Sequence, residues 1–163
     1  MTDLHGLFSR ARERLEGAPQ EALGELLTGR RFLSIARADR IKPYGEAWHL
    51  GVLLLTADEV LATGEIVRAR TEAPRGYTAE SQRARSALAA AAARGGFPDG
   101  RAVHVGWRRL DLDAIARGAA SVPLSVVDGE PLVQWSGSAM RAPLAGYLDE
   151  RVELLLRPPL GAN

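Results

Sequence analysis

Three arginines precede a predicted helix, and their types and spacing suit the binding of an anion. Arg68 and Arg70 are two residues apart in a segment with strand character, so their side chains should leave the same side of the strand. Arg75 follows in a loop, and Thr78 is of a residue type that favours the N-cap of a helix. Guanidinium groups bind carboxylates and phosphates through paired hydrogen bonds, and a helix N-terminus offers further N–H donors. The pattern therefore predicts a small anionic ligand at Arg68, Arg70, Arg75 and Thr78.

The same arginines could instead have a purely structural role. Glu65, Glu72 and Glu80 lie within a few residues and could pair with them on a solvated surface. Residues 30–109 contain 14 basic and 8 acidic residues, whereas the segments on either side are net acidic. A basic central region could face an anion, or the acidic segments could neutralise it in the folded chain. Both interpretations remain open from the sequence.

Two histidines could supply acid–base chemistry beside such a site. His104 and His49 are the candidate catalytic residues, because imidazole titrates near neutral pH and can act as a general base. The alternative function is therefore a small hydrolase or transferase acting on a phosphate- or carboxylate-bearing substrate. A metal site built from both histidines and Glu65 would require three separate strands to converge, which the spacing does not demand. We expect no metal and no cofactor, and histidines that are hydrogen-bonded to backbone or water.

A second alternative is weak nucleic-acid binding. Clustered cations attract phosphates, and aromatic rings can stack on bases. The isoelectric point near 8.2 is lower than that of a dedicated nucleic-acid binder, and no nucleic-acid-binding motif is present. We therefore do not expect nucleic acid as the main partner. This alternative draws on the residues of the anion site and, in addition, on Arg30, Arg31, Arg37, Arg40, Lys42, Tyr44, Trp48 and Tyr77.

Composition excludes several classes of protein. The 163 residues include no cysteine, which rules out disulfides, thiolate metal sites and cysteine nucleophiles. Phosphate-binding glycine loops, dinucleotide-binding turns, His-Glu-x-x-His helices and serine nucleophile elbows are also missing. The first 30 residues contain five acidic residues, and the longest apolar run is far too short to cross a bilayer. We expect a cytoplasmic protein with no membrane partner.

The elements that must position these residues follow from hydrophobic periodicity. A first helix should begin after Asp3 and end before Gly17, and a second should span residues 19–29. Further helices are predicted over residues 79–94, with Thr78 as N-cap, over residues 112–117 and after Pro143. The helix predicted between Asp3 and Gly17 has one apolar face, which consists of Leu4, Leu7, Phe8, Ala11 and Leu15.

Strands are predicted between the helices. Residues 32–38, 47–56, 59–69 and 101–109 have strand character, and residues 39–45 read as a turn. The Asp128-Gly129 pair between two runs of β-formers, residues 122–127 and 131–135, is typical of a hairpin. Glycines at positions 51, 64 and 106 fall inside predicted strands, where they could allow the sheet to bend.

Together these segments predict an α+β fold. It should have a mainly antiparallel, curved sheet of five or six strands, with N-terminal, middle and C-terminal helices packed on it, in one globular domain over residues 1–163. Trp48, Trp107 and Trp135 lie in strand-like segments and are expected in the core or in a dimer interface. A sheet face that exposed tryptophan and leucine would be covered by a second copy, so we expect a non-catalytic homodimer.

Overall fold

A computed structural model describes residues 3–29, 31–32, 35–71, 76, 79–137 and 139–161. The chain divides into two compact units, and each combines segments that are distant in sequence. The first unit contains Met1–Gln20, Ala47–Thr63 and Arg108–Asn163, and the second contains Glu21–Glu46 and Gly64–Trp107. The sequence prediction of one globular domain stays a prediction.

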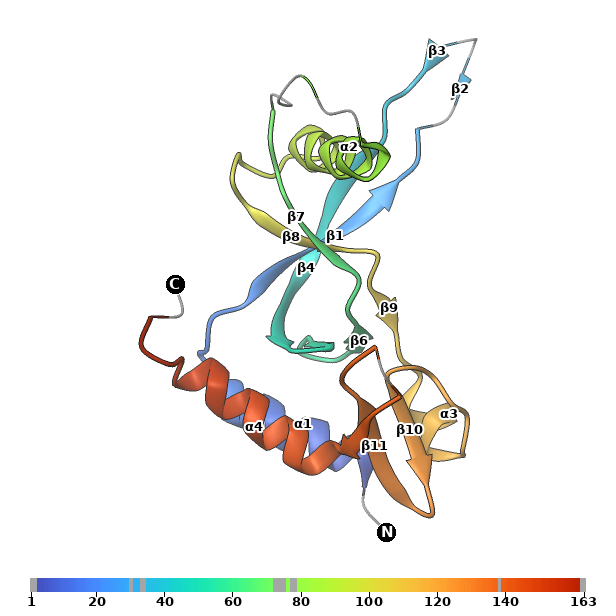
Figure 1. Cartoon of the computed structure of the whole chain (residues 1–163), viewed down its shortest axis with the longest axis vertical. Coiled ribbons are helices and arrows are strands. Elements are labelled where there is room, and N and C mark those ends of the chain that lie inside the picture. The colour runs from blue at the N-terminus through green and yellow to red at the C-terminus, as the bar shows by residue number, and fades with distance from the viewer. Residues whose placement is uncertain are drawn as a thin grey trace. The chain divides into compact units, whose positions relative to one another are not determined.

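The described residues form helices and strands in a mixed order (Figure 1). The helices are α1 (Leu4–Leu15), α2 (Glu80–Arg94), α3 (Leu112–Ala116) and α4 (Leu144–Leu156). The first strands are β1 (Glu21–Leu27), β2 (Arg31–Phe32), β3 (Ile35–Ala36), β4 (Arg40–Leu50), β5 (Leu53–Leu55) and β6 (Val60–Ala62). The later strands are β7 (Glu65–Arg68), β8 (Ala102–Val105), β9 (Arg108–Arg109), β10 (Leu124–Val127), β11 (Glu130–Gln134) and β12 (Arg141–Pro143).

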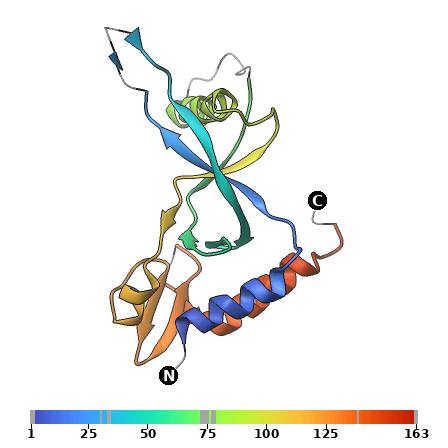
Figure 2. The ribbon, with the colours of Figure 1, turned by 180° about the vertical axis from the view of Figure 1, so that it is seen from behind.

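The predicted α+β class is confirmed, with more strands than expected. Seven strands follow the order β7-β8-β1-β4-β5-β6-β9, and β10-β11-β12 form a separate sheet. The β1–β8 pair is parallel, whereas β4–β5, β5–β6, β6–β9 and β7–β8 are antiparallel. The short strands β2 and β3 form a hairpin between β1 and β4 (Figure 2).

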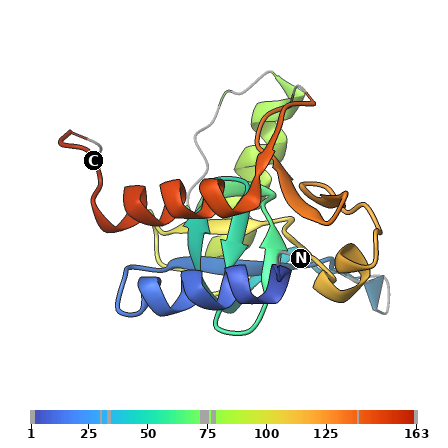
Figure 3. The same cartoon turned by 90° about the horizontal axis from the view of Figure 1, so that it is seen from below.

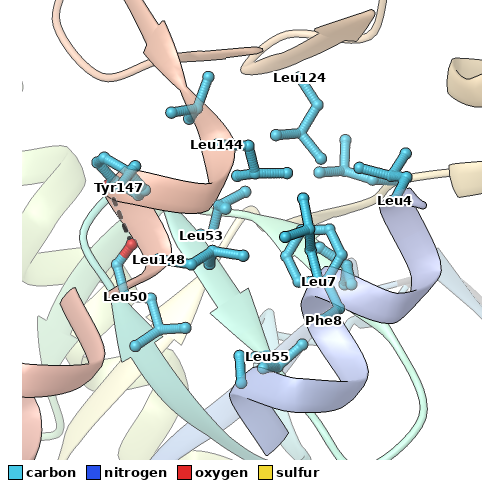
Figure 4. Packing of buried hydrophobic residues seen from close by; sticks show 14 of the residues in the cluster. Leu4, Leu7, Phe8, Leu50, Leu53, Leu55, Leu124, Leu144, Tyr147 and Leu148 are labelled. Atoms are coloured by element: carbon cyan, nitrogen blue, oxygen red, sulfur yellow. Dashed lines mark hydrogen bonds between the residues drawn. The ribbon is translucent and has the colours of Figure 1, made fainter. Parts of the chain in front are cut away.

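The first unit is built around a core rich in leucine. Helices α1 and α4 run side by side and bury their apolar faces against β5 and β6 (Figure 3). Arg14 of α1 joins the two helices, because its guanidinium donates to Asp149 at 2.7 Å and to Glu153 at 2.8 Å. The side chains packed in this core include Leu4, Leu7, Phe8, Leu53, Leu55, Leu144 and Leu148 (Figure 4).

Tyr147 of α4 forms hydrogen bonds with the turn between β4 and β5. The Tyr147 hydroxyl donates to the Leu50 carbonyl at 3.0 Å (Figure 4). It also accepts from the Val52 N–H at 2.9 Å. Gly51 lies between these two residues with φ of +67°, and a Cβ there would collide with the hydroxyl. Glycine is therefore required at this position both by the backbone conformation and by the close approach of Tyr147.

The second unit has a core of small and branched side chains. Helix α2 packs on β7 and β8 through Ala91 and Ala92, which are almost fully buried. Alanine has the highest helix propensity and lets the helix backbone approach the sheet closely. The core also includes Ala69, just after β7, and the strand residues Ala22, Ile41, Val67, Val103 and Val105.

One predicted helix is wrong: residues 19–29 contain strand β1. Their leucine spacing fits a helix face, but Leu23 pairs with β8 as part of a parallel ladder. Gly24 allows β1 to pack closely, because a Cβ there would collide with Ile41 and Val103. Long-range strand pairing therefore overrides the local helix preference.

Several predicted strand boundaries also need correction. Of residues 39–45, predicted as a turn, residues 40–45 belong to the 11-residue strand β4, where Pro43 is exposed. Proline is tolerated in a strand where its missing N–H is not needed by a neighbour. The predicted strands 47–56, 59–69 and 101–109 are each divided in two, at Gly51, Gly64 and Gly106 respectively. These glycines end strands instead of bending continuous ones.

The remaining helices and the hairpin are confirmed. Helices α1, α2, α3 and α4 lie within one or two residues of their predicted bounds. Strands β10 and β11 pair with Val127 opposite Glu130, which leaves the predicted Asp128-Gly129 pair as the two-residue turn. Within the described ranges, no helix is both long enough and apolar enough to span a membrane.

Candidate anion-binding site

Of the arginines predicted to bind an anion, Arg68 is the last residue of β7 in the second unit, and Arg70 lies two residues further along the chain. Side chains alternate along β7 and its continuation, so that Val67 and Ala69 are buried while Ile66, Arg68 and Arg70 are exposed. Helix α2 follows in the chain and packs against β7. The predicted pairing of the two arginines on one side of the strand agrees with this burial pattern.

A cavity of about 440 Å³ lies between β7 and α2. This volume is within the range of cavities that hold small ligands. The residues from α2 that line it recur at helical spacing and so form one stripe of the helix. The lining consists of Ile66, Val67, Arg68 and Arg70 from the strand side and Gln82, Arg85, Ser86 and Ala89 from the helix. Three guanidinium groups, an amide and a hydroxyl thus accompany apolar walls.

Backbone and side-chain contacts hold the strand side of the cavity. Nη1 of Arg68 donates to the Gly100 carbonyl at 3.2 Å. Asp99 accepts from the Thr71 N–H at 2.8 Å and from the Thr71 hydroxyl at 2.6 Å. These two hydrogen bonds, assisted by the charge of Arg70, lower the pKa of Asp99. Asp99 therefore remains a carboxylate at neutral pH and fixes the chain directly after Arg70.

Within the described ranges, the arginines of the cavity lack direct ion pairs. Among the residues that the structure describes, Arg68, Arg70 and Arg85 make no carboxylate contact within 4 Å. Asp99 influences Arg70 electrostatically, but its Oδ1 atom is occupied by Thr71. Like charges gathered at one cavity favour the binding of a negatively charged group.

Helix α2 does not have the N-cap that the sequence predicts. Arg75 and Thr78 lie outside the described residues. The N-cap of α2 is Ala79, not Thr78, and it makes no side-chain capping hydrogen bond. The cavity instead uses side chains along one face of α2, from Gln82 to Ala89. The predicted ligand-binding residues do not include Arg85; its helical spacing from Gln82 and Ala89 is the signal that could have placed it here.

The two candidate catalytic histidines do not line the cavity. His104 of β8 is about 1% exposed, and its Nε2 atom pairs with the carboxylate of Glu21 in β1. His49 is half-buried in the first unit, where its Nε2 atom lies 2.9 Å from the Gly51 carbonyl. Glu65 pairs opposite Val105, one residue from His104 along β8, so Glu65 and His104 point to opposite faces. The postulated set of two histidines and Glu65 is therefore not formed.

Two of the three tryptophans are held by structural contacts. Trp107 donates to the Gly24 carbonyl at 2.8 Å and packs against Tyr44 with ring centroids 4.6 Å apart. Trp48 donates to the Ala18 carbonyl at 3.2 Å. Trp135, in contrast, is about 42% exposed. Tyr77, part of the nucleic-acid alternative, lies outside the described residues.

Comparison of the chain with protein-family models, with curated proteins and with solved structures found no match. The geometry of the cavity is therefore the basis for a functional proposal.

Proposed function

We propose that this chain is a non-catalytic, homodimeric protein that binds an anionic ligand in the cavity between β7 and α2. The observation that carries this proposal is the lining of the cavity by Arg68, Arg70 and Arg85 without a described ion-pair partner. Guanidinium groups form charge-assisted hydrogen bonds with phosphate and carboxylate oxygens, and Ser86 and Gln82 add neutral donors. The apolar walls at Ile66 and Ala89 suit a ligand with a hydrocarbon part.

The position of His104 favours binding over catalysis. A general base must come within hydrogen-bond reach of the proton that it removes. His104 is almost completely buried, is paired with Glu21 and is not among the residues that line the cavity. A ligand held by the arginines would therefore not meet this imidazole without a rearrangement of the sheet.

Calorimetric titration with inorganic phosphate and with succinate tests the proposed site. The double variant Arg68→Ala/Arg70→Ala should bind either anion about tenfold or more weakly, because charge-assisted hydrogen bonds are lost. Arg83→Ala is the control, since it removes one guanidinium group from α2 at a position outside the cavity lining. The proposal fails if the parent protein binds neither anion, or if the double variant binds as tightly as the parent.

Self-association is supported by an exposed apolar pair in the first unit. Gln134 pairs with Arg141 in the β11–β12 ladder, so Trp135 and Met140 follow at the same end of that ladder. They are about 42% and 56% exposed, and large apolar side chains of this kind are commonly covered by a partner. Sedimentation should give a dimer for the parent and a monomer for Trp135→Glu, with the exposed Leu154→Glu as control. A monomeric parent would remove this part of the proposal.

A further inference from the structure

Among the residues that the structure describes, the outer edge of β7 has backbone groups without a partner. Strand β7 is the end strand of its sheet and, among the described residues, it pairs with β8 alone. Ala69 donates to the Arg101 carbonyl and accepts from the Gly100 N–H, so the odd-numbered residues turn their backbone groups toward β8. Because this direction alternates, the backbone groups of Ile66 and Arg68 point away from β8. Such an edge can template the addition of another strand.

Helix α2 sets the limit of this open edge. The Arg70 N–H donates to the Ala89 carbonyl of α2 at 3.1 Å, which closes the edge at that residue. Ile66 and Arg68 are therefore the two residues of β7 whose backbone N–H and C=O groups face outward without a partner among the described residues. Since residues that face one way recur with period two, an added strand would be about four residues long.

The side chains along this edge define the chemistry of an added strand. Ile66, Arg68 and Arg70 occupy alternate positions, and all three line the cavity together with Arg85. Ile66 is about 43% exposed. A segment with an apolar residue opposite Ile66 and acidic residues at the next alternate positions would place its carboxylates beside the arginines. A second copy of β7 would instead bring the two arginine pairs together, and facing like charges are destabilising.

We propose that the anionic ligand of this cavity is an acidic, extended segment of a partner protein, which adds to the outer edge of β7 as an extra β-strand. The backbone hydrogen bonds of Ile66 and Arg68 hold the segment, and the arginines select its acidic side chains. This inference rests on the proposed function, because it names the class of ligand for the same site.

A short fluorescent peptide, Thr-Val-Thr-Glu-Thr-Glu-Thr, tests this inference with the full-length chain. Two further versions carry N-methyl groups, either on the Val and Glu amides or on the intervening Thr amides. One set of alternate amides faces β7 in an added strand and the other faces away. Fluorescence anisotropy should show a loss of about tenfold or more for one methylated peptide and near-parental binding for the other.

Amide hydrogen exchange gives an independent measurement at the edge. The N–H groups of Ile66 and Arg68 should become protected when the peptide is added but not when inorganic phosphate is added. The Arg68→Glu/Arg70→Glu variant should lose the acidic peptide and gain the corresponding peptide with Lys in place of Glu. Arg83→Ala should bind as the parent does, because Arg83 does not line the cavity.

Four outcomes would overturn strand addition. If both methylated peptides bind as tightly as the unmethylated peptide, the arginines bind its carboxylates without backbone pairing to β7. The proposed anion site is then retained and strand addition is rejected. If oligothymidine binds and the peptide does not, the partner is a nucleic acid. If Ile66 and Arg68 become protected with rising protein concentration alone, the occupant is a second copy. If phosphate, succinate and peptide all fail to bind, the proposed function fails as well.

Discussion

In the first unit the buried side chains are mainly leucines, whereas the core of the second unit consists mainly of alanine and valine. Large side chains from α1 and α4 fill the space over β5 and β6. In the second unit, the small residues Ala91 and Ala92 bring the backbone of α2 close to the sheet. The first core should therefore be most sensitive to lost volume, and the second to added volume.

The arginines of the two units also differ, in the groups with which they form hydrogen bonds and ion pairs. In the first unit, Arg12 donates to the carbonyls of Thr56 and Glu59, and Arg14 pairs with two carboxylates of α4. Burial lowers the pKa of Arg12, and the nearby charge of Asp58 opposes this effect. The cavity arginines of the second unit have no such carboxylate contact among the described residues. Arg12 and Arg14 thus stabilise the first unit, whereas the cavity arginines of the second unit are those proposed for ligand binding.

The largest expected effect is on the leucine-rich core. Phe8→Ala should lower the free energy of unfolding by about 3–5 kcal/mol, because Phe8 is fully buried and its removal leaves a cavity. Urea denaturation followed by circular dichroism measures this change. The exposed Leu154→Ala on α4 is the control and should change stability little. A loss below about 1 kcal/mol for Phe8→Ala would show that this core tolerates lost volume.

An intermediate effect is expected in the second unit, for the opposite kind of change. Ala92→Leu should destabilise the protein by about 1–3 kcal/mol, since the added side chain has no space between α2 and the sheet. Ala87→Leu, on the exposed side of the same helix, serves as the control. Equal urea midpoints for the two leucine variants would contradict the expectation that the second core is sensitive to added volume.

The smallest effect concerns Asp99 and the pH dependence of stability. Hydrogen bonds from Thr71 and the charge of Arg70 lower the pKa of Asp99 in the folded protein. The stability that this carboxylate contributes is therefore present above its unfolded pKa of about 3.9, and it is lost as the pH falls through the lower folded value. The parent should lose stability more steeply below about pH 4 than Asp99→Asn does. Parallel curves of urea midpoint against pH would contradict this assignment.

Local patterns in the sequence were sufficient for most helices. Helices α1 and α4 have one continuous apolar face, and the Asp128-Gly129 turn has few alternatives. The prediction failed at β1 because its leucines satisfy helical spacing, while its strand state depends on β8, about 80 residues later in the chain. The same dependence on distant partners divides the long predicted strands at Gly51, Gly64 and Gly106.

The candidate site was predicted where it depends on adjacent residues. Arg68 ends β7 and Arg70 continues the same alternation of buried and exposed side chains, and this period of two is visible in the sequence. Arg85 and Ser86 come from α2, and their approach to β7 follows from the packing of Val67 and Ala69 on the helix. The role of β7 as an edge strand was also beyond local reasoning, since strand order is a property of the whole sheet.

The contact of Tyr147 with the β4–β5 turn has a consequence for how the protein is synthesised. The ribosome produces α1 and the Gly51 turn long before it produces α4, so the hydroxyl that bonds Leu50 and Val52 arrives late. All segments of the second unit have been translated once Trp107 is added. Because compact units fold as their residues emerge from the ribosome, the second unit can fold first. Helix α1 reaches its packed state only after α4 has been synthesised.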